Sequence, residues 1–388
     1  TAIILANKGI HVSGFDINPE IVNKVNKGES HIFEPNLKVA LKKAINSGNL
    51  FANIIPSKAD FFIIAVPTPL KKNGKSIPEA NIDLVLKSIR SIAPYLEKGN
   101  SIILESTSPV GTTKVIARLI FDITGFNDKE IMFAYCPERV LPGNIMQELI
   151  FNDRIIGGLN IQSSVKCLQL YKKFCKGKIH ITDSKTAELA KLCENAYRDL
   201  NIAFANEISM VCDNLGINDK ELIKLTNHHP RVNILNPSCG VGGHCIAVDP
   251  WFIASAAPHI TPLIQTSRKV NLFKTEWVFN KIINLINEYK NEKKSSPQLG
   301  IFGFTFKPDS DDTRESPALL IIKKLLKKDF KIKVCEPNLD YYEGIQLISH
   351  EEALKSDILI FLVSHRSFKD LIIENKFTLD FCGVINHK

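Results

Sequence analysis

A glycine-rich segment brings two cysteines, a histidine and an aspartate into one short stretch of the chain. It reads NPSCGVGGHCIAVDPWF from residue 236 and contains Cys239, His244, Cys245 and Asp249. Glycines let the backbone approach a ligand closely and leave N–H groups for an oxyanion, and a thiol beside such donors can be held as the thiolate. The segment therefore has the groups that covalent chemistry at Cys245 needs. The same pattern also fits a tight loop around two buried, inert cysteines, so the spacing alone leaves both interpretations open.

Metal binding and disulfide exchange fit this segment poorly. Cys239 and Cys245 have five residues between them, and His244 adjoins Cys245 too closely for easy joint chelation. No second pair of cysteines or histidines stands nearby at ligand spacing, and the sequence lacks the C-x-x-C of a disulfide-exchange site. We therefore expect no metal site.

The composition is typical of a globular protein that handles small anionic ligands. The chain has 388 residues, of which 44% are hydrophobic, enough for two or three domains. The net charge is +8, but the lysines are spread along the chain among Asp and Glu residues. This distribution favours phosphate-bearing small molecules over nucleic acid as ligands. Nine scattered cysteines form no disulfide framework, and no apolar run reaches the roughly 18 residues of a membrane span. We expect a cytoplasmic protein with no nucleic-acid or membrane partner.

Short apolar strands alternate with helical stretches over the first part of the chain, which predicts a doubly wound parallel sheet with helices on both faces. The expected strands lie in HVSGFD at residue 11, FFIIAV at 61, SIILES at 101, IMFAY at 131 and RIIGG at 154. Ligands of such sheets bind beyond the carboxyl ends of the strands. The polar residues at those ends are Asp16, Thr68, Ser106, Thr107 and Glu138.

Asp16 has two interpretations of equal weight. It matches the acidic residue that hydrogen-bonds the adenosine ribose in dinucleotide-binding folds, and it also matches an N-cap of the next helix. The G-x-G-x-x-G that should precede it by roughly twenty residues is absent. TAIILANKG at residue 1 is typical of the second half of the helix that follows those glycines. We therefore expect the first strand and its glycine turn to be missing, upstream of Thr1.

A long helix and a second alternating region complete the chain. Residues 183–215 read as one helix that begins near Asp183 or Ser184 and is stopped by Gly216. After further helical material and the linker-like NEKKSSPQ at 291, LGIFGF, KIKVCE and DILIFLV predict strands, with a helix over SPALLIIKKLLKK. The expected fold class is α/β, with two Rossmann-like doubly wound domains joined by a central helical domain that has one long helix. The expected domains are residues 1–182, 183–290 and 291–388.

The segment GVGGHCIAVDPWF resembles the active-site signature of the UDP-sugar 6-dehydrogenases, within the UDP-glucose/GDP-mannose dehydrogenase family. Other segments resemble this family in order and spacing along essentially the whole chain. They are FDINPEIV at 15, VPTP at 66, ESTSPVGTT at 105, CPER at 136, AELAKLCENAYRDLNIAFANE at 187 and FGFTFKPDSDDTRESPA at 302. The resemblance implies that the first domain binds NAD, the central domain carries the catalytic loop and the last domain binds the UDP-sugar. The implied reaction is a two-step oxidation of a C6 alcohol to a carboxylate through a cysteine thioester.

The resemblance also implies roles for particular residues. In the catalytic set, Cys245 is the nucleophile, Lys191 stabilises negative charge on the C6 oxygen with Asn195 as a companion donor, and Glu138 handles the hydrolytic water with Thr107 and Asp249. The implied cofactor-binding residues are Asp16, Thr68, Thr107 and Arg314. The implied substrate-binding residues are Glu138, Arg139, Lys191, Asn195, Arg231, Gly243 and Lys307. The spacing of Lys191 and Asn195, four residues apart on the long helix, puts both on one face. Family members of this type have Pro-Gly where this chain has Ser238-Cys239, and we take Cys239 to be a bystander.

The cysteine loop also bears on the sugar. It is more similar to family members that oxidise UDP-N-acetyl-D-mannosamine, because UDP-glucose enzymes carry Ser in place of His244 and Lys in place of Val248. The expected product is UDP-N-acetyl-D-mannosaminuronate for surface polysaccharide biosynthesis. UDP-N-acetylglucosamine and UDP-glucose remain alternative substrates, and a non-catalytic nucleotide-sugar binding protein is the alternative of another class. A homodimer is expected, because so long a helix has more apolar surface than one small domain covers.

Overall fold

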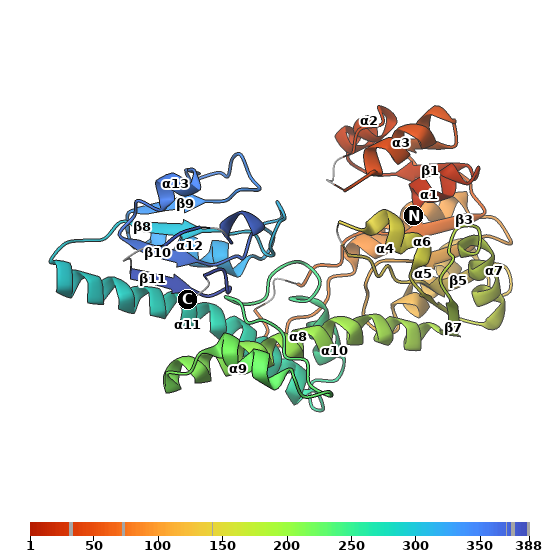
Figure 1. Ribbon diagram of the computed structural model, residues 1–388. Coiled ribbons are helices and arrows are strands. Elements are labelled where there is room, and N and C mark those ends of the chain that lie inside the picture. Colours follow the sequence, from red (N-terminus) through yellow and green to blue (C-terminus); the bar gives the residue numbers. More distant parts are fainter. Residues whose placement is uncertain (31–33, 72–73, 142, 370, 374–376, 386–388) are drawn as a thin grey trace. The chain divides into compact units, whose positions relative to one another are not determined.

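The computed structural model describes residues 1–30, 34–71, 74–141, 143–369, 371–373 and 377–385. The chain forms two compact units, residues 1–192 (unit 1) and 193–388 (unit 2), and the boundary lies inside helix α8 (Ser184–Leu215). Each unit contains a sheet that is covered by helices on both faces (Figure 1). The predicted α/β fold is confirmed, and the long helix has the predicted bounds.

Unit 1 contains a five-stranded sheet of order β3-β4-β5-β6-β7 and a two-stranded sheet of β1 and β2. The strands are β1 (Val12–Phe15), β2 (Leu50–Asn53), β3 (Phe61–Ile64), β4 (Ser101–Leu104), β5 (Met132–Tyr135), β6 (Arg154–Gly158) and β7 (Ile179–Asp183). All pairs are parallel except β5 with β6, which is antiparallel.

The antiparallel pair corrects the prediction of a purely parallel sheet. In the part of the β5–β6 connection that the structure describes, α6 (Ile145–Phe151) is the one helix, and the chain re-enters the sheet from the end at which β5 leaves it. A connection at one end of a sheet makes neighbouring strands antiparallel, whereas a parallel pair needs a crossover to the opposite end. Antiparallel strands are common toward the edge of an otherwise parallel sheet.

The five-stranded sheet is buried because its strands are apolar on both faces. Ile102 and Leu104 of β4 pack with α4 (Asp83–Ile92), η1 (Ala93–Tyr95) and α5 (Thr112–Thr124). Ile103 points the other way, toward α1 (Ala2–Asn7), α6 and α7 (Ile161–Tyr171). The remaining helices of the unit before α8 are α2 (Pro19–Asn26) and α3 (Leu37–Asn46). This two-sided packing fixes the strand ends that carry the candidate site residues.

Unit 2 contains a fully parallel sheet of order β11-β10-β8-β9 (Figure 1). Its strands are β8 (Leu299–Phe302), β9 (Ile332–Cys335), β10 (Ile358–Phe361) and β11 (Phe377–Asp380). Ile301 faces α11 (Pro262–Lys293) and α12 (Pro317–Leu326), while Phe302 faces α13 (His350–Ala353) and η2 (Arg366–Phe368). The ring of Phe302 stacks on Phe361 at a centroid distance of 4.3 Å. Successive strand residues thus fill two separate cores.

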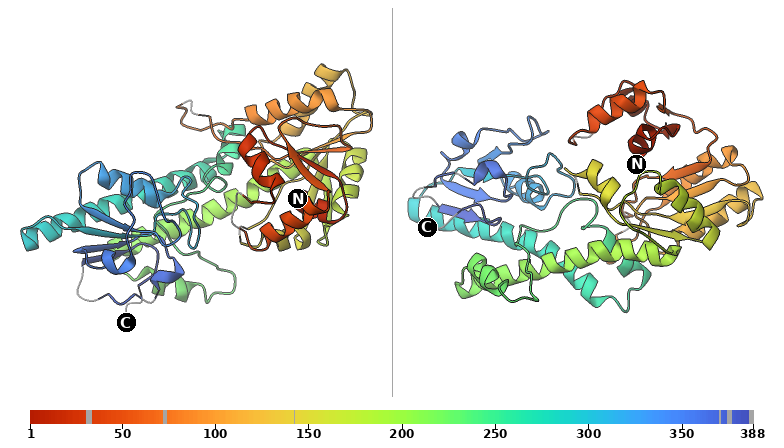
Figure 2. Two further views of the ribbon diagram at one scale, coloured as in Figure 1. Left: turned by 90° about the horizontal axis from the view of Figure 1, so that it is seen from above. Right: turned by 45° about the vertical axis from the view of Figure 1, so that its right-hand side comes forward.

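Helix α11 has 32 residues, as the predicted long helix α8 does, so the structure adds a second long helix that the sequence analysis did not identify. The two helices lie side by side in unit 2 (Figure 2) and are joined by buried polar side chains. Arg268 donates to Asp199 at 2.5 Å, and Asn271 donates to the same carboxylate oxygen at 2.8 Å. Paired buried charges of this kind fix the register of two helices. The other helices of unit 2 are α9 (Asp219–Thr226) and α10 (Asp249–Ala256). No helix in the described residues is long and apolar enough to cross a membrane.

Candidate active site

Cys245 lies at the end of an irregular loop that leads into α10. Its backbone carbonyl accepts the N–H groups of Val248 at 3.0 Å and Asp249 at 2.8 Å, so a tight turn joins the cysteine to the first residue of the helix. The Cys245 side chain is half-buried, whereas Asp249 is buried. The turn therefore holds a partly accessible thiol beside a buried carboxylate.

The long helix holds this turn in place. Asn195 of α8 donates its side-chain amide to a carboxylate oxygen of Asp249 at 2.5 Å, and both side chains are buried. Sequence reasoning expected Asn195 and Asp249 to act separately, one on the substrate oxygen and one on water. The structure instead joins them directly. A buried carboxylate requires such donors, so the contact also explains an asparagine at this position on α8.

The glycines of the loop are required for packing. A Cβ added to Gly242 would lie 2.6 Å from the carbonyl oxygen of Glu315 and 3.0 Å from the Cβ of Phe306. Gly243 has a φ of +80° and donates its N–H to the carbonyl of Arg314 at 3.0 Å. The expectation that the loop N–H groups are left for an oxyanion is therefore wrong for Gly243. The segment after β8 lies directly against the cysteine loop.

Replacing Gly242 by alanine tests this close approach. We expect Gly242→Ala to lower the free energy of unfolding by about 1–3 kcal/mol, because the backbone at Glu315 must shift to admit a methyl group. Urea denaturation measures the change. Gly14→Ala is the control, because a Cβ there would meet its nearest atom at an ordinary 3.6 Å. Equal stability of the Gly242→Ala variant and the parent protein would contradict the packing argument.

Arg314 brings positive charge to the cysteine loop. Its guanidinium binds Asp312 through two nitrogens, with Nε at 2.9 Å from Oδ1 and Nη2 at 2.5 Å from Oδ2. These hydrogen bonds raise the pKa of Arg314, and the nearby Cys245 side chain contributes in the same direction. The guanidinium is therefore within electrostatic range of the Cys245 sulfur. Partial burial, together with the charge of Arg314, lowers the pKa of His244.

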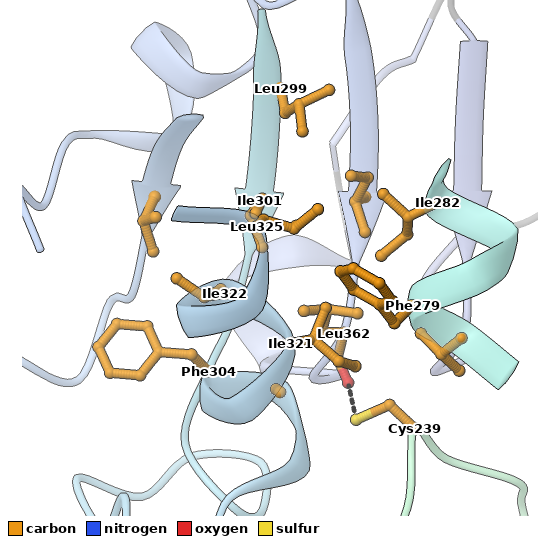
Figure 3. Packing of buried hydrophobic residues seen from close by; sticks show 14 of the residues in the cluster. Cys239, Phe279, Ile282, Leu299, Ile301, Phe304, Ile321, Ile322, Leu325 and Leu362 are labelled. Atoms are coloured by element: carbon orange, nitrogen blue, oxygen red, sulfur yellow. Dashed lines mark hydrogen bonds between the residues drawn. The ribbon is translucent and has the colours of Figure 1, made fainter. Parts of the chain in front are cut away.

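Cys239 occupies a different environment. It is buried in the core formed by α11, α12 and the sheet of unit 2, and its thiol lies 3.6 Å from the carbonyl oxygen of Leu362 (Figure 3). Burial raises the pKa of Cys239 to about 12. A thiol with so high a pKa is a poor nucleophile near neutral pH. These observations support the interpretation of Cys239 as a bystander.

Lys307 and Arg231 are the other residues of unit 2 that were expected to bind the substrate. Lys307 is half-buried in the segment after β8, and its ammonium group lies 5.9 Å from the centre of the Phe306 ring. Arg231 is exposed on a turn that Asn227 closes through two hydrogen bonds with the backbone of Ile234. The contacts described for Arg231 do not join it to the cysteine loop, so its role in substrate binding stays a prediction.

In unit 1 the structure joins two expected cofactor residues. The hydroxyl of Thr68, after β3, donates to the carbonyl of Thr107, after β4, at 2.5 Å. Ser106 donates to the carbonyl of Val66 at 2.7 Å and closes the same two loops together. Asp16 follows β1 and accepts the N–H of Asn18, whose own side chain caps α2. Asp16 is therefore not the N-cap of that helix.

Glu138 follows β5 and pairs with a buried arginine. Arg154 is 3% exposed, and its Nη2 lies 3.4 Å from Oε2 of Glu138 and 3.1 Å from the carbonyl of Leu149. The other oxygen of Glu138 accepts the N–H of Arg139 at 2.8 Å. The Arg139 guanidinium itself donates to the carbonyl of Asp153. Glu138 is thus a half-buried carboxylate with an oriented cationic partner, and sequence reasoning missed Arg154.

Helix α8 carries Lys191 and, in its second turn, Glu188, a buried residue that sequence reasoning missed. Lys191 is half-buried, one turn before Asn195. Glu188 is buried and accepts the N–H groups of Gly111 and Thr113 and the hydroxyl of Thr113. Its carboxylate therefore takes the donors at the start of α5 and fixes α8 against that helix. The meeting of Lys191, Glu138 and Cys245 at one substrate stays a prediction.

Comparison with known proteins accounts for all these elements together. Residues 1–175, 185–272 and 300–387 match the NAD binding domain, the central domain and the UDP binding domain of the UDP-glucose/GDP-mannose dehydrogenase family. The chain belongs to this family. It is a nucleotide-sugar dehydrogenase with an NAD-binding domain of the Rossmann type.

Individual relatives cover nearly the whole chain. The UDP-N-acetyl-D-mannosamine dehydrogenase of Campylobacter jejuni is 45% identical over 98% of this chain and 96% of its own length. The NDP-N-acetyl-D-galactosaminuronic acid dehydrogenase of Ralstonia nicotianae is 43% identical over 96% of this chain and 89% of its own. The solved UDP-D-ManNAc dehydrogenase of Pyrococcus horikoshii superimposes with a TM-score of 0.92 at 34% identity, covering 100% of this chain and 93% of that one.

Proposed function

We propose that this dehydrogenase oxidises the C6 alcohol of UDP-N-acetyl-D-mannosamine to the carboxylate, through a thioester on Cys245. The observation that carries this proposal is the half-buried Cys245, which a tight turn joins to Asp249, the partner of Asn195, and which lies within electrostatic range of Arg314. A thiol used only for packing would lie in the core, as Cys239 does. A thiol that is partly accessible, positioned and close to a cation suits covalent catalysis.

The residues of unit 1 fit the cofactor. NAD, when bound, accepts the hydride of each oxidation. Asp16 offers a carboxylate after β1, suited to ribose hydroxyls, and the joined loops of Thr68 and Thr107 offer polar groups beyond β3 and β4. The first N–H groups of α5 are bound by Glu188, so that helix end does not offer these donors to a phosphate.

The atoms and electrons of the reaction at Cys245 balance with NAD as the oxidant in both oxidations and water as the final nucleophile. Oxidation of the alcohol releases a hydride and a proton and leaves an aldehyde at C6. The thiolate then adds to the aldehyde carbon, forming a C–S bond while the carbonyl electron pair moves to oxygen. Loss of the remaining C6 hydride restores the carbonyl and gives the thioester. Sulfur suits both the addition to the aldehyde and the later hydrolysis of the thioester, because a thiolate is strongly nucleophilic and also leaves easily.

Three groups assist these steps in the proposal. Lys191 and Asn195 share one face of α8, and the ammonium group of Lys191 stabilises the negative charge that develops on the C6 oxygen. Asn195 acts through Asp249, which it holds at the start of α10. Glu138 accepts a proton from the water that attacks the thioester, after which the C–S bond breaks and the thiolate of Cys245 leaves.

The sugar is tested by direct comparison. Relatives named for N-acetylmannosamine and for N-acetylgalactosaminuronic acid differ little in identity to this chain, at 45% and 43%, so the galacto sugar is the second candidate. We expect purified enzyme to form two NADH per UDP-N-acetyl-D-mannosamine, faster than with UDP-N-acetylgalactosamine, UDP-N-acetylglucosamine or UDP-glucose. A higher kcat/KM for another sugar would reassign the substrate. Tight binding without NADH formation from any of them would favour the non-catalytic alternative.

We propose that the enzyme is a homodimer, and the exposed apolar side chains of α8 support this proposal. Tyr197, Phe204 and Val211 are 70%, 51% and 46% exposed, and their spacing of seven residues puts them on one side of the helix. We expect the enzyme to sediment as a dimer at micromolar concentration, and Phe204→Lys to dissociate it because the charge cannot be buried in an apolar interface. Leu225→Lys, at an exposed position of α9, is the control. A monomeric parent enzyme would contradict the prediction.

A further inference from the structure

A buried carboxylate and imidazole lie together at the carboxyl ends of the unit 2 strands. Glu336 directly follows β9, and His365 follows β10 by a few residues. The two side chains are 0% exposed, and Nε2 of His365 lies 3.1 Å and 3.2 Å from the two carboxylate oxygens. Neither residue belongs to the site expected from the sequence. Burying a carboxylate is costly unless it is fully hydrogen-bonded, so the pair requires an explanation.

The pair holds the segment that follows β8. One oxygen of Glu336 accepts the N–H groups of Phe304 at 2.8 Å and Thr305 at 3.2 Å. The other end of the pair, Nδ1 of His365, accepts the N–H of Asp309 at 3.0 Å. Because Nδ1 accepts a hydrogen bond, the ring proton lies on Nε2 and is donated to Glu336. The imidazole therefore links the carboxylate to the far end of residues 304–309.

The carboxylate is ionised in this arrangement. Burial works against its charge, but hydrogen bonds from His365 and from backbone N–H groups outweigh burial and lower the pKa of Glu336. A charged acceptor strengthens each hydrogen bond that it receives. The segment after β8 is thus held by charge-assisted contacts at Phe304 and Thr305, and through the imidazole at Asp309.

The same segment bears directly on the cysteine loop. The Phe306 side chain lies so close to Gly242 and Gly243 that a Cβ on Gly243 would be 2.9 Å from its ring. Phe306 donates its N–H to the carbonyl of Asp312 at 2.9 Å, and the carbonyl of Arg314 accepts the N–H of Gly243 at 3.0 Å. Gly243 is two residues before Cys245. A shift at residues 304–309 therefore acts directly on Gly242 and Gly243, which precede Cys245 in the loop.

We propose that His365 and Glu336 are positioning residues for the reaction, which set the segment of residues 304–314 so that nucleotide binding and the orientation of Cys245 depend on one another. The proposal rests on the proposed function. The segment carries Lys307 and Arg314, to which the family resemblance assigns substrate and cofactor contacts, and it packs against the cysteine loop. One buried carboxylate–imidazole pair thus supports both the nucleotide-binding residues and the cysteine loop.

Variants of His365 separate its two contacts. His365→Asn keeps an acceptor near the place of Nδ1 for the Asp309 N–H, and His365→Gln keeps a donor near the place of Nε2 for Glu336. We expect His365→Gln to raise the Kd for UDP and the KM for the UDP-sugar about 10-fold, the effect of one lost hydrogen bond to a buried donor. His365→Asn should keep the Kd for UDP and the KM for the UDP-sugar within about 3-fold of the parent values, because it retains the Asp309 contact.

The rate at which iodoacetamide alkylates Cys245 reports its orientation independently of turnover. In the parent enzyme we expect bound UDP to slow the alkylation of Cys245. His365→Gln and Glu336→Gln should change the alkylation rate about 5-fold or more and abolish this protection by UDP. The rates are measured well below the Tm of each variant. The matched control is His350→Gln, because His350 pairs with Glu351 at 2.9 Å on the surface of the same unit. Glu336→Gln keeps the volume of the side chain and carries the test if His365→Gln does not fold.

The alternative is that Glu336 and His365 have only a structural role. If the variants lower Tm but leave UDP affinity, KM, kcat and the alkylation rate within about twofold of the parent enzyme, the positioning role is overturned. UDP titration and alkylation require no turnover, so they remain decisive even if the enzyme oxidises none of the tested sugars. That separate outcome would overturn the proposed function and leave the positioning role standing.

Discussion

Cys245→Ser should reduce formation of the sugar acid by about 10³-fold or more while leaving UDP-sugar binding close to that of the parent enzyme. Serine fills the space of the thiol, but its hydroxyl is a weak nucleophile without a dedicated base, and an ester hydrolyses less readily than a thioester. The guanidinium of Arg314, which favours a thiolate, cannot ionise a hydroxyl of much higher pKa. NADH formation, together with the intact mass of the protein after incubation with UDP-sugar and NAD, measures both effects.

Cys239→Ser is the matched control for this variant. Cys239 lies six positions earlier in the same loop, is buried, and approaches the carbonyl oxygen of Leu362, to which a serine hydroxyl can also donate. We expect a loss of about 1 kcal/mol in stability and little change in activity. Near-normal acid formation by Cys245→Ser, or a greater loss in Cys239→Ser, would return the loop to a structural role.

The two cysteines show how environment separates residues of one type. Cys239 packs among apolar side chains of α11, α12 and the sheet, and burial raises its pKa to about 12. Cys245 lies instead on a turn into α10 whose first residue, Asp249, is bound by Asn195, and it is within electrostatic range of Arg314. The glycines between them allow the segment after β8 to approach. A flexible loop could not keep one sulfur buried and the other presented.

The sequence predicted those elements whose pattern is local. The apolar runs of β3, β4 and β10 and the uninterrupted helical pattern of α8, which is capped by Asp183 and followed by Gly216, were sufficient. Strand β2 was missed because its four residues, LFAN, are too short a run to show a strand period. Helix α11 was not recognised as one 32-residue helix because its apolar positions are interrupted by buried polar residues such as Arg268 and Asn271.

The site was predictable only where a single segment carries its chemistry. Cys245, Asp249 and the glycines stand in one motif, whereas Asn195 and Asp249 are 54 residues apart and their direct contact has no signature in either segment. Arg154 and Glu188 are buried charges whose partners, Glu138 and Thr113, lie on other elements. Such pairs become visible only when strands and helices are placed, because burial is what makes the pairing necessary.

Glu138→Gln carries the second large expected effect. If Glu138 accepts a proton from the attacking water, glutamine at this position should slow hydrolysis by about 10²–10³-fold, while the two oxidations before it proceed. The thioester on Cys245 should then accumulate, visible as an added mass of the bound UDP-sugar acyl group on the intact protein. Pre-steady-state NADH formation should show a burst of two equivalents per active site, followed by slow turnover.

Loss of the Glu138 carboxylate also affects the stability of the protein, so the Glu138→Gln variant needs a control. Arg154 is 3% exposed and pairs with Glu138, so removing the carboxylate leaves a buried guanidinium with one partner fewer, and the variant should also lose about 1–3 kcal/mol in stability. Glu97→Gln is the control, because the pair of Glu97 with Lys58 is exposed and contributes little. Measurements well below the Tm of the variant separate catalysis from stability. A Glu138→Gln enzyme that hydrolyses the thioester at the parent rate would remove Glu138 from the chemistry and leave it as the partner that neutralises Arg154.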